Sequence, residues 1–128
     1  MIVVADTSPL NYLVLLGYIK VVPEIYGEVL IPQAVLDELQ DSEAPAEVRA
    51  WLSTPPPWLK ISSTSYQADP LLDLLDRGER DAILLAESVK ADRLIIDDLD
   101  GRREAENRKL PVIGTLGILA GSCSPQSS

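Results

Sequence analysis

The feature that most limits how this chain can fold is the alternation of short aliphatic runs with segments of helical periodicity. The aliphatic runs, rich in Val, Ile and Leu, are residues 2–5, 29–31, 58–61, 94–96 and 112–113. Between them, residues 10–16, 34–39, 46–52, 79–90, 102–109 and 115–120 have a helical pattern. Short strands separated by helices are typical of a parallel sheet that is buried on both faces. The sequence therefore predicts an α/β fold with helices on both sides of a central parallel sheet.

The remaining segments are shorter and less regular. We expect an extended stretch over 19–22, a polar loop over 62–69 and a helical turn or two over 70–75. The chain has 128 residues, which suits one domain and leaves no room for two independent cores. We expect that domain to cover residues 1–120, with 121–128 as a small polar tail that lacks a folding signal.

Composition removes several classes of function. The formal net charge of −9 disfavours a general nucleic-acid coat protein. The chain has no His and one Cys, Cys123, so zinc chemistry, a His-based catalytic triad and an internal disulfide are disfavoured as well. Apolar runs are far shorter than the roughly 18 residues that a membrane helix needs. These observations indicate a protein of the reducing cytoplasm, with no membrane partner.

Acidic residues follow two of the predicted strands. Asp6 comes directly after the first strand, and Asp97, Asp98 and Asp100 follow the strand that ends at Ile96. In an open parallel sheet the carboxyl ends of the strands lie at one edge, where ligands bind. A single Asp at such a position is commonly only a turn residue or helix N-cap. Two strands that end in this way favour a site.

Two helical acids are candidates for the same edge. Glu38 falls between Ala34 and Val35 on the apolar side of its helix, whereas Asp37 lies opposite. Asp81 lies one turn before Leu84 on the longest predicted helix. The alternatives are that Glu38 borders the core but reaches water, and that Asp81 complements the helix dipole.

Together, Asp6, Glu38, Asp81 and Asp98 form a candidate acidic group. Several carboxylates cannot all stay ionised at close quarters without a compensating cation. Oxygen ligands of this kind select Mg²⁺ or Mn²⁺.

Five segments resemble the PIN-domain ribonucleases, in the same order along the chain. More narrowly, they resemble a PIN-like branch that is related to toxin–antitoxin nucleases. The segments are Val4–Leu10, Ile31–Leu39, Gly78–Ile83, Ile96–Asp98 with Gly101-Arg102, and Val112–Gly117. The resemblance implies a three-layer α/β/α sandwich and an acidic pocket that binds Mg²⁺ or Mn²⁺ to hydrolyse RNA phosphodiester bonds.

The resemblance also implies roles for individual residues. Asp6, Glu38, Asp81 and Asp98 match the acidic quartet, with Asp6, Asp81 and Asp98 as metal ligands and Glu38 as ligand or base. Asp97 is the alternative to Asp98, because the register of that motif varies. Ser8 matches a small polar residue that supports the first acid. Arg102 matches a basic residue of the substrate site, and the alternative is a structural arginine.

Other functions and partners stay open at this point. The first alternative is a catalytically inactive PIN-like module that binds protein. A receiver domain is disfavoured because its paired acids come early in the chain, and a haloacid-dehalogenase-type phosphatase because Ser8 stands where its second Asp belongs. Arg102, Arg103, Arg108 and Lys109 are candidates for gripping an RNA backbone, unless they belong to a solvated helix face. The short sequence after the apolar 115–120 helix leads us to expect a homodimer. The resemblance to toxin-like nucleases implies an antitoxin protein as the alternative partner.

Overall fold

Five parallel strands form the centre of the molecule in a computed structural model that describes residues 1–64 and 69–123. They are β1 (Val3–Ala5), β2 (Val29–Ile31), β3 (Leu59–Ile61), β4 (Arg93–Ile95) and β5 (Val112–Ile113). Their order in the sheet is β3-β2-β1-β4-β5. The pairing sets Val4 beside Leu30 on one side and beside Leu94 on the other. The predicted parallel α/β fold is thus confirmed.

Helices connect the strands largely where periodicity predicts them. They are α1 (Thr7–Leu16), α2 (Val21–Tyr26), α3 (Gln33–Gln40), α4 (Ala46–Leu52), α5 (Arg77–Val89), α6 (Leu99–Asn107) and α7 (Thr115–Cys123).

Two local predictions are wrong. The 19–22 stretch is not extended, because Val21 begins helix α2 and Val22 packs into the core from it. Residues 70–75 form consecutive turns in place of a helix, with Leu72 buried against α5.

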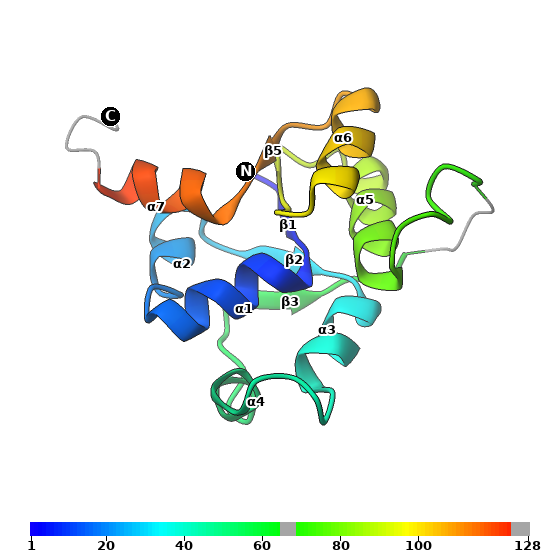
Figure 1. Ribbon diagram of the computed structural model, residues 1–128. Coiled ribbons are helices and arrows are strands. Elements are labelled where there is room, and N and C mark those ends of the chain that lie inside the picture. The colour runs from blue at the N-terminus through cyan, green and yellow to red at the C-terminus, as the bar shows by residue number, and fades with distance from the viewer. Residues whose placement is uncertain (65–68, 124–128) are drawn as a thin grey trace.

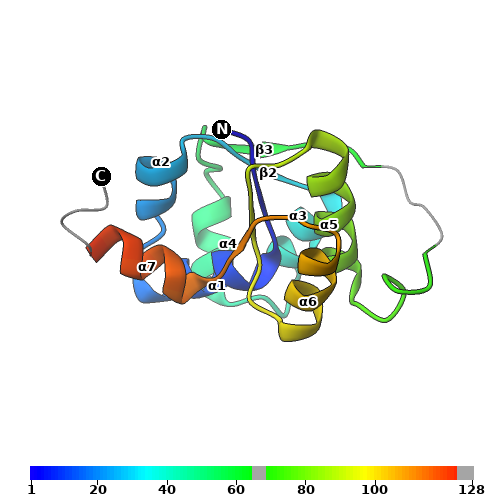
Figure 2. The ribbon, with the colours of Figure 1, turned by 90° about the horizontal axis from the view of Figure 1, so that it is seen from above.

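Helices cover both faces of the sheet, which gives the predicted three-layer sandwich (Figures 1 and 2). On one face, Leu10 and Leu13 of α1 pack with apolar residues of α2, α3, α4 and α7. On the other face, α5 and α6 pack against Val4, Leu94 and Ile96. Helix α3 contacts both α4 and α5 at the edge of the sheet. The core is therefore two aliphatic layers separated by very short strands.

The C-terminal helix is longer than predicted. Helix α7 continues to Cys123, three residues past the expected end at Ala120. Residues 124–128 lie outside the described part of the chain, so the division of the chain near residue 120 stays a prediction. No helix among the described residues is long and apolar enough to cross a membrane.

The strand order fixes where a ligand site is expected. The chain moves from β1 outward through β2 to β3, then returns to the other side of β1 to form β4 and β5. The connections after β1 and β4 therefore leave a crevice at the carboxyl ends of these neighbouring strands. Asp6 follows β1 and Asp97 and Asp98 come shortly after β4, so the acidic residues lie at this crevice.

Candidate active site

Asp6 is the most deeply buried acid of the crevice. Its backbone amide donates to the carbonyl oxygen of Ile95, 2.9 Å away, so β1 holds the residue against β4. The residue is only 2% exposed, and its Oδ1 atom has no hydrogen-bond partner within the described residues. Burial raises the pKa of Asp6 to about 8; the Thr7 amide opposes this shift, and the carboxylates of Asp76, Glu79 and Glu38 add to it. A buried carboxylate oxygen is unfavourable in this state, because neither a cation nor a hydrogen-bond donor compensates for its removal from water.

Glu38 reaches the same crevice from helix α3. Its Oε1 atom accepts a hydrogen bond from the Thr7 hydroxyl at 2.5 Å, and its Oε2 atom accepts one from the Gly78 amide at 3.1 Å. A Cβ atom at position 78 would lie 2.5 Å from Oε1 of Glu38, so only glycine allows this approach. The carboxylate is thereby fixed between α1 and α5. This placement is consistent with the prediction that Glu38 points inward, whereas no local sequence pattern singles out Thr7.

Helix α5 contributes two acids that the sequence analysis did not select. Asp76 caps the helix by accepting from the Glu79 amide at 2.8 Å, and the Glu79 side chain in turn accepts from the Asp76 amide at 3.3 Å. Glu79 is 8% exposed. Its pKa is raised to about 7, chiefly by burial and in addition by the nearby Asp76 and Asp98 carboxylates. Asp76 and Glu79 therefore cap the helix and also extend the group of carboxylates around Asp6.

Asp81 has a different environment from Glu79. Its Oδ1 atom pairs with Nε of the adjacent Arg80 at 3.1 Å, and its side chain is largely buried. The two positions are two residues apart on α5, so their side chains leave the helix in divergent directions. Glu79, together with the N-cap residue Asp76, raises the pKa of Asp6 from this helix.

The two consecutive acids after β4 separate. Both oxygens of Asp97 accept hydrogen bonds from Thr115, from its amide at 2.7 Å and from its hydroxyl at 2.6 Å. Asp98 caps helix α6 by accepting from the Gly101 amide at 3.0 Å, and it also acts on Glu79. Asp98 therefore adjoins the carboxylates near Asp6, whereas Asp97 ties β4 to the start of α7.

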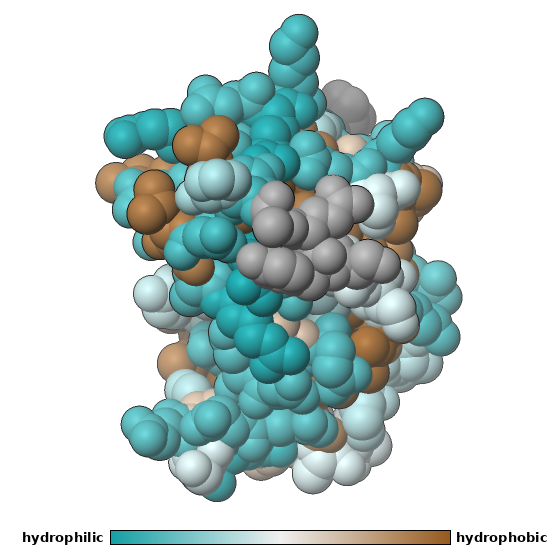
Figure 3. Space-filling model, turned by 90° about the vertical axis from the view of Figure 1, so that its right-hand side faces the viewer, coloured by the Kyte–Doolittle hydropathy of each residue, from teal (hydrophilic) through white to brown (hydrophobic). Residues whose placement is uncertain are grey.

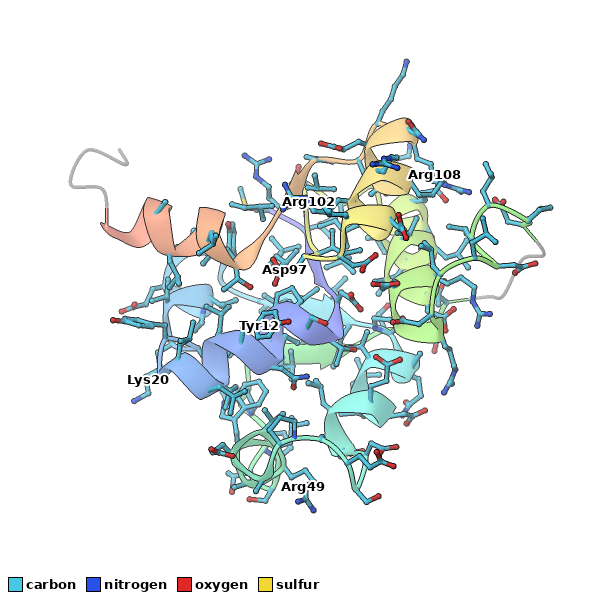
Figure 4. The ribbon with its side chains drawn as sticks, in the orientation of Figure 1. Tyr12, Lys20, Arg49, Asp97, Arg102 and Arg108 are labelled. Atoms are coloured by element: carbon cyan, nitrogen blue, oxygen red, sulfur yellow. The ribbon has the colours of Figure 1, made fainter. Side chains whose placement is uncertain are left out.

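Arg102 lies beside Asp97 at the rim of the crevice (Figure 4). A Cβ atom at Gly114 would come within 2.5 Å of Arg102 Nη1 and 2.7 Å of Asp97 Oδ1, so a larger residue there would displace one of these side-chain ends. Within the described residues, Arg102 forms no ion pair at 4.0 Å or less. Arg102 is thus a cation with unused hydrogen-bond donors next to the acids.

Ser8 is partly buried in the first turn of α1.

Arg108 does not share that property. Its three guanidinium nitrogens pair with Asp69 at 2.6 Å, Glu87 at 3.0 Å and Glu104 at 2.6 Å. These contacts fasten the 69–75 turns to α5 and α6, so Arg108 is a structural residue. The side of the molecule that carries this segment is mainly hydrophilic, with separate apolar patches (Figure 3). The outer side of α6 thus fits the alternative interpretation, a solvated helix face, better than it fits a contact between Arg108 and an RNA backbone.

The donor set suits a hard divalent cation. Asp6 offers a buried oxygen without a partner, and further carboxylates surround it. In the described part of the chain, no three acidic or Cys side chains already stand at the spacing that holds one metal ion. Mg²⁺ keeps several of its waters in proteins and needs only one or two direct carboxylates. The residues present therefore fit such an ion.

The structure is a parallel α/β fold with an acidic crevice at the carboxyl ends of β1 and β4. A family model described as a PIN domain matches residues 2–124, nearly the whole chain. The chain belongs to the PIN domain family, which confirms the resemblance of the five sequence segments. Proteins with this domain are generally nucleases.

One solved structure supports the fold independently. The chain is similar to a PilT N-terminus domain protein from the hyperthermophilic archaeon Sulfolobus solfataricus P2, with a TM-score of 0.65 and 16% sequence identity. The match covers 97% of this chain and 95% of the other. At this identity the likeness concerns the fold alone. No match was found among curated proteins.

Proposed function

We propose that this protein is a divalent-metal-dependent endoribonuclease that hydrolyses RNA phosphodiester bonds at the crevice between β1 and β4. The observation that carries the proposal is the Asp6 carboxylate, which is buried among other acids with one oxygen lacking a partner. A group in this state is unfavourable in a purely structural role, because burial without a partner destabilises the charged form. Membership in a family of nucleases supports the same proposal.

We assign the metal, Mg²⁺ or Mn²⁺, primarily to Asp6 and Asp98. Glu79 is the acid of α5 that adjoins both of them. Asp81 stays in the proposed set as the residue that matches the family motif, and Asp97 is the less favoured alternative to Asp98, since both of its oxygens already accept from Thr115. When bound, a divalent ion supplies a water of lowered pKa and neutralises charge on the phosphate.

Glu38 is the residue best prepared to orient an attacking water. Its two oxygens are fixed by the Thr7 hydroxyl and the Gly78 amide, and each carboxylate oxygen retains a second lone pair. A carboxylate held in this way accepts a proton without changing its position. Thr7 and Gly78 are accordingly positioning residues, and Ser8 in the same turn is proposed to support the first acid.

Arg102 is the proposed contact for the RNA backbone. It lies at the rim beside Asp97 and is not engaged by a carboxylate within the described residues. A guanidinium forms paired hydrogen bonds with phosphate oxygens, which Lys cannot reproduce in the same geometry. A local cation of this kind offsets, at the site, the repulsion expected from a net charge of −9.

A toxin role with an antitoxin partner, a homodimer and a cytoplasmic location remain proposals. The expectation of a homodimer rested on an uncovered α7. In that helix Ile118 is buried and Leu119 is partly buried, whereas Leu116 is 81% exposed. The support from α7 is therefore confined to its first turn, and sedimentation at micromolar concentration measures the oligomeric state.

Cleavage of a panel of single-stranded and structured RNAs tests the function. The assay compares Mg²⁺, Mn²⁺ and EDTA for the wild-type protein, the Asp6→Asn variant and the Asp41→Asn variant. Asp41 is an exposed acid after α3, so its substitution removes the same charge away from the crevice. We expect metal-dependent cleavage by wild type and Asp41→Asn, and a loss of about 100-fold or more in Asp6→Asn, since even outer partners of metal ligands contribute 10–100-fold.

Absence of cleavage by the wild-type protein with either metal contradicts the proposal. It favours the alternative of a catalytically inactive PIN-like module that binds protein. Equal cleavage by wild type and Asp6→Asn also contradicts the proposal, because it separates the activity from the crevice.

A further inference from the structure

The turns over residues 69–75 lead directly into the acidic crevice and lie beside α5 (Figures 1 and 2). Their last residue, Leu75, precedes Asp76, which caps α5 and exchanges hydrogen bonds with Glu79. In the same turn of the helix, the Gly78 amide donates to Glu38 at 3.1 Å. The end of the 69–75 turns is thus the start of the part of α5 that contributes to the crevice.

The opposite end of these turns is anchored by Arg108. Its Nη2 atom pairs with Oδ2 of Asp69 at 2.6 Å, and Oδ1 of Asp69 accepts from the Leu71 amide at 3.0 Å. The Asp69 carbonyl oxygen also accepts from the amides of Leu72 and Asp73, each at 3.0 Å. Asp69 therefore joins the folded turns to Arg108.

We propose that Arg108 is a positioning residue for the acidic crevice: through Asp69 it anchors the 69–75 turns, and the turns hold Asp76 in place at the crevice. The inference rests on the proposed function, because it assigns to Arg108 an effect on metal binding at that site. It goes beyond the role of fastening the turns to α5 and α6, since it makes the geometry of the crevice depend on the pair between Asp69 and Arg108.

Apolar burial alone holds the turns weakly. Leu72 is fully buried in the core beside α5, but Leu71 is 59% exposed and Leu74 is 85% exposed. A gap of about 230 Å³ lies between the leucines of the turns and helix α6. Segments with few buried contacts open at a lower free energy than the core does. The pair with Arg108 is therefore a main attachment of this segment, together with Leu72.

Arg108 is itself held in one orientation. Its Nε atom pairs with Glu104 at 2.6 Å, its Nη1 atom pairs with Glu87 at 3.0 Å, and its side chain is 16% exposed. Isolated surface ion pairs contribute little to stability, whereas several pairs on one guanidinium form a network of defined geometry. Because Glu104 belongs to α6 and Glu87 to α5, this network places Asp69 relative to both helices.

The first residue after the turns acts on the central acid of the crevice. Burial is the main reason that the pKa of Asp6 is raised, and among the neighbouring carboxylates Asp76 contributes most. The interaction between two charges depends on their separation. A shift of Asp76 therefore changes the electrostatic potential where the cation is proposed to bind.

Two single substitutions separate the turns from the rest of the Arg108 network. Asp69→Asn removes the charge that pairs with Arg108 and retains an oxygen that accepts from the Leu71 amide. Glu87→Gln is the matched control, because it also removes one carboxylate partner of Arg108, but from α5 and not from the turns. Urea unfolding of both variants measures the general stability that each loses.

Hydrogen exchange of the Glu79 amide, followed by NMR in EDTA, reports on the Asp76 cap, because this amide donates to Asp76. The amide of Leu85, in the buried middle of α5, reports on global unfolding. In Asp69→Asn we expect the Glu79 amide to exchange roughly 2- to 30-fold faster relative to that of Leu85, and Mn²⁺ to bind roughly 2- to 30-fold more weakly in calorimetry. Glu87→Gln is expected to match the wild type in both measurements.

The outcomes separate this inference from the function on which it rests. Wild-type values for both measurements in Asp69→Asn overturn the inference, and so do equal changes in Asp69→Asn and Glu87→Gln. Faster Glu79 exchange with unchanged Mn²⁺ affinity also overturns it, because the turns then do not influence the site. If the wild-type protein binds no Mn²⁺, the proposed metal-dependent function fails, and faster Glu79 exchange in Asp69→Asn alone still supports the positioning of Asp76.

Discussion

Asp6 and Asp97 lie at the ends of neighbouring strands, yet their surroundings are opposite. Asp6 is buried with an oxygen that lacks a partner, whereas both oxygens of Asp97 accept hydrogen bonds from Thr115. Side chains alternate along a strand, so Val4 and Ile96 pack toward α5, and Ala5 and Ile95 pack toward α1. The same alternation sends Asp6 toward the acids of α5 and Asp97 toward α7.

The comparison indicates that one crevice holds acids with two tasks, structural stabilisation and ligand binding. An acid whose hydrogen-bonding capacity is met by the protein contributes to stability. An acid whose capacity is unmet is available for a cation or substrate, at the expense of the stability of the protein without that ligand. The following predictions test whether Asp6 and Asp97 divide the work in this way.

The largest effect expected in these tests is a loss of RNA cleavage, and it identifies which acid of α5 acts together with Asp6. Glu79→Gln keeps the shape of the capping side chain but removes its ability to ionise next to Asp6 and Asp98. We expect RNA cleavage to fall by about 10- to 100-fold, as for other groups that support a metal site. Asp81→Asn is the matched variant. We expect its RNA cleavage to fall less than that of Glu79→Gln, because Arg80 already pairs with Asp81. A larger loss for Asp81→Asn than for Glu79→Gln identifies Asp81 as the working acid of α5.

The next prediction concerns Asp97 and the free energy of unfolding. Asp97→Ala leaves the Thr115 amide and hydroxyl without their acceptor. Each unsatisfied buried group destabilises the folded protein by about 1–3 kcal/mol. We therefore expect the free energy of unfolding, measured by urea denaturation, to decrease by at least about 1–3 kcal/mol. Asp6→Asn is expected to leave it unchanged or to raise it in EDTA, because no hydrogen bond is lost and a buried acid is removed. Equal destabilisation by both variants contradicts the comparison.

A smaller effect is the pH dependence of the metal-free protein. Burial raises the pKa of Asp6 from 3.8 to about 8, so between these values the folded state holds a proton that the unfolded state has released. Stability therefore decreases as pH rises from about 4 to about 8, by at most about 1.4 kcal/mol per pH unit for one proton. Thermal unfolding in EDTA at a series of pH values measures this slope. The Asp6→Asn variant is expected to flatten it, and an unchanged slope assigns the proton to another group.

Much of the fold could be predicted from the sequence because its signals are local. The aliphatic runs that form β1, β2 and β4, and the periodicity that forms α5, need no distant partner to be recognised. Asp6 was accessible to the same reasoning, since the end of a parallel strand fixes the edge on which it lies. The 19–22 stretch was misread because its β-branched residues favour a strand, while packing of Val22 in the core favours helix α2.

The remainder of the site depends on contacts between distant segments. Glu79 has the pattern of a helix-capping residue, and its burial beside Asp6 arises only from how α5 packs on the sheet. The separation of Asp97 from Asp98 follows from a bond to Thr115, 18 residues later in the chain. Arg108 has the pattern of a basic surface residue, yet it is neutralised in part by Asp69, 39 residues away. No local spacing encodes these pairings.

Calorimetric titration of Mn²⁺ into the wild-type, Asp6→Asn and Asp97→Asn proteins tests the central claim most directly. The claim is that Asp6 is kept free for a cation while Asp97 is committed to Thr115. We predict saturable binding to the wild-type protein, loss of that binding in Asp6→Asn, and its retention in folded Asp97→Asn. Binding that is retained in Asp6→Asn, or that is absent from the wild-type protein at millimolar Mn²⁺, contradicts the claim.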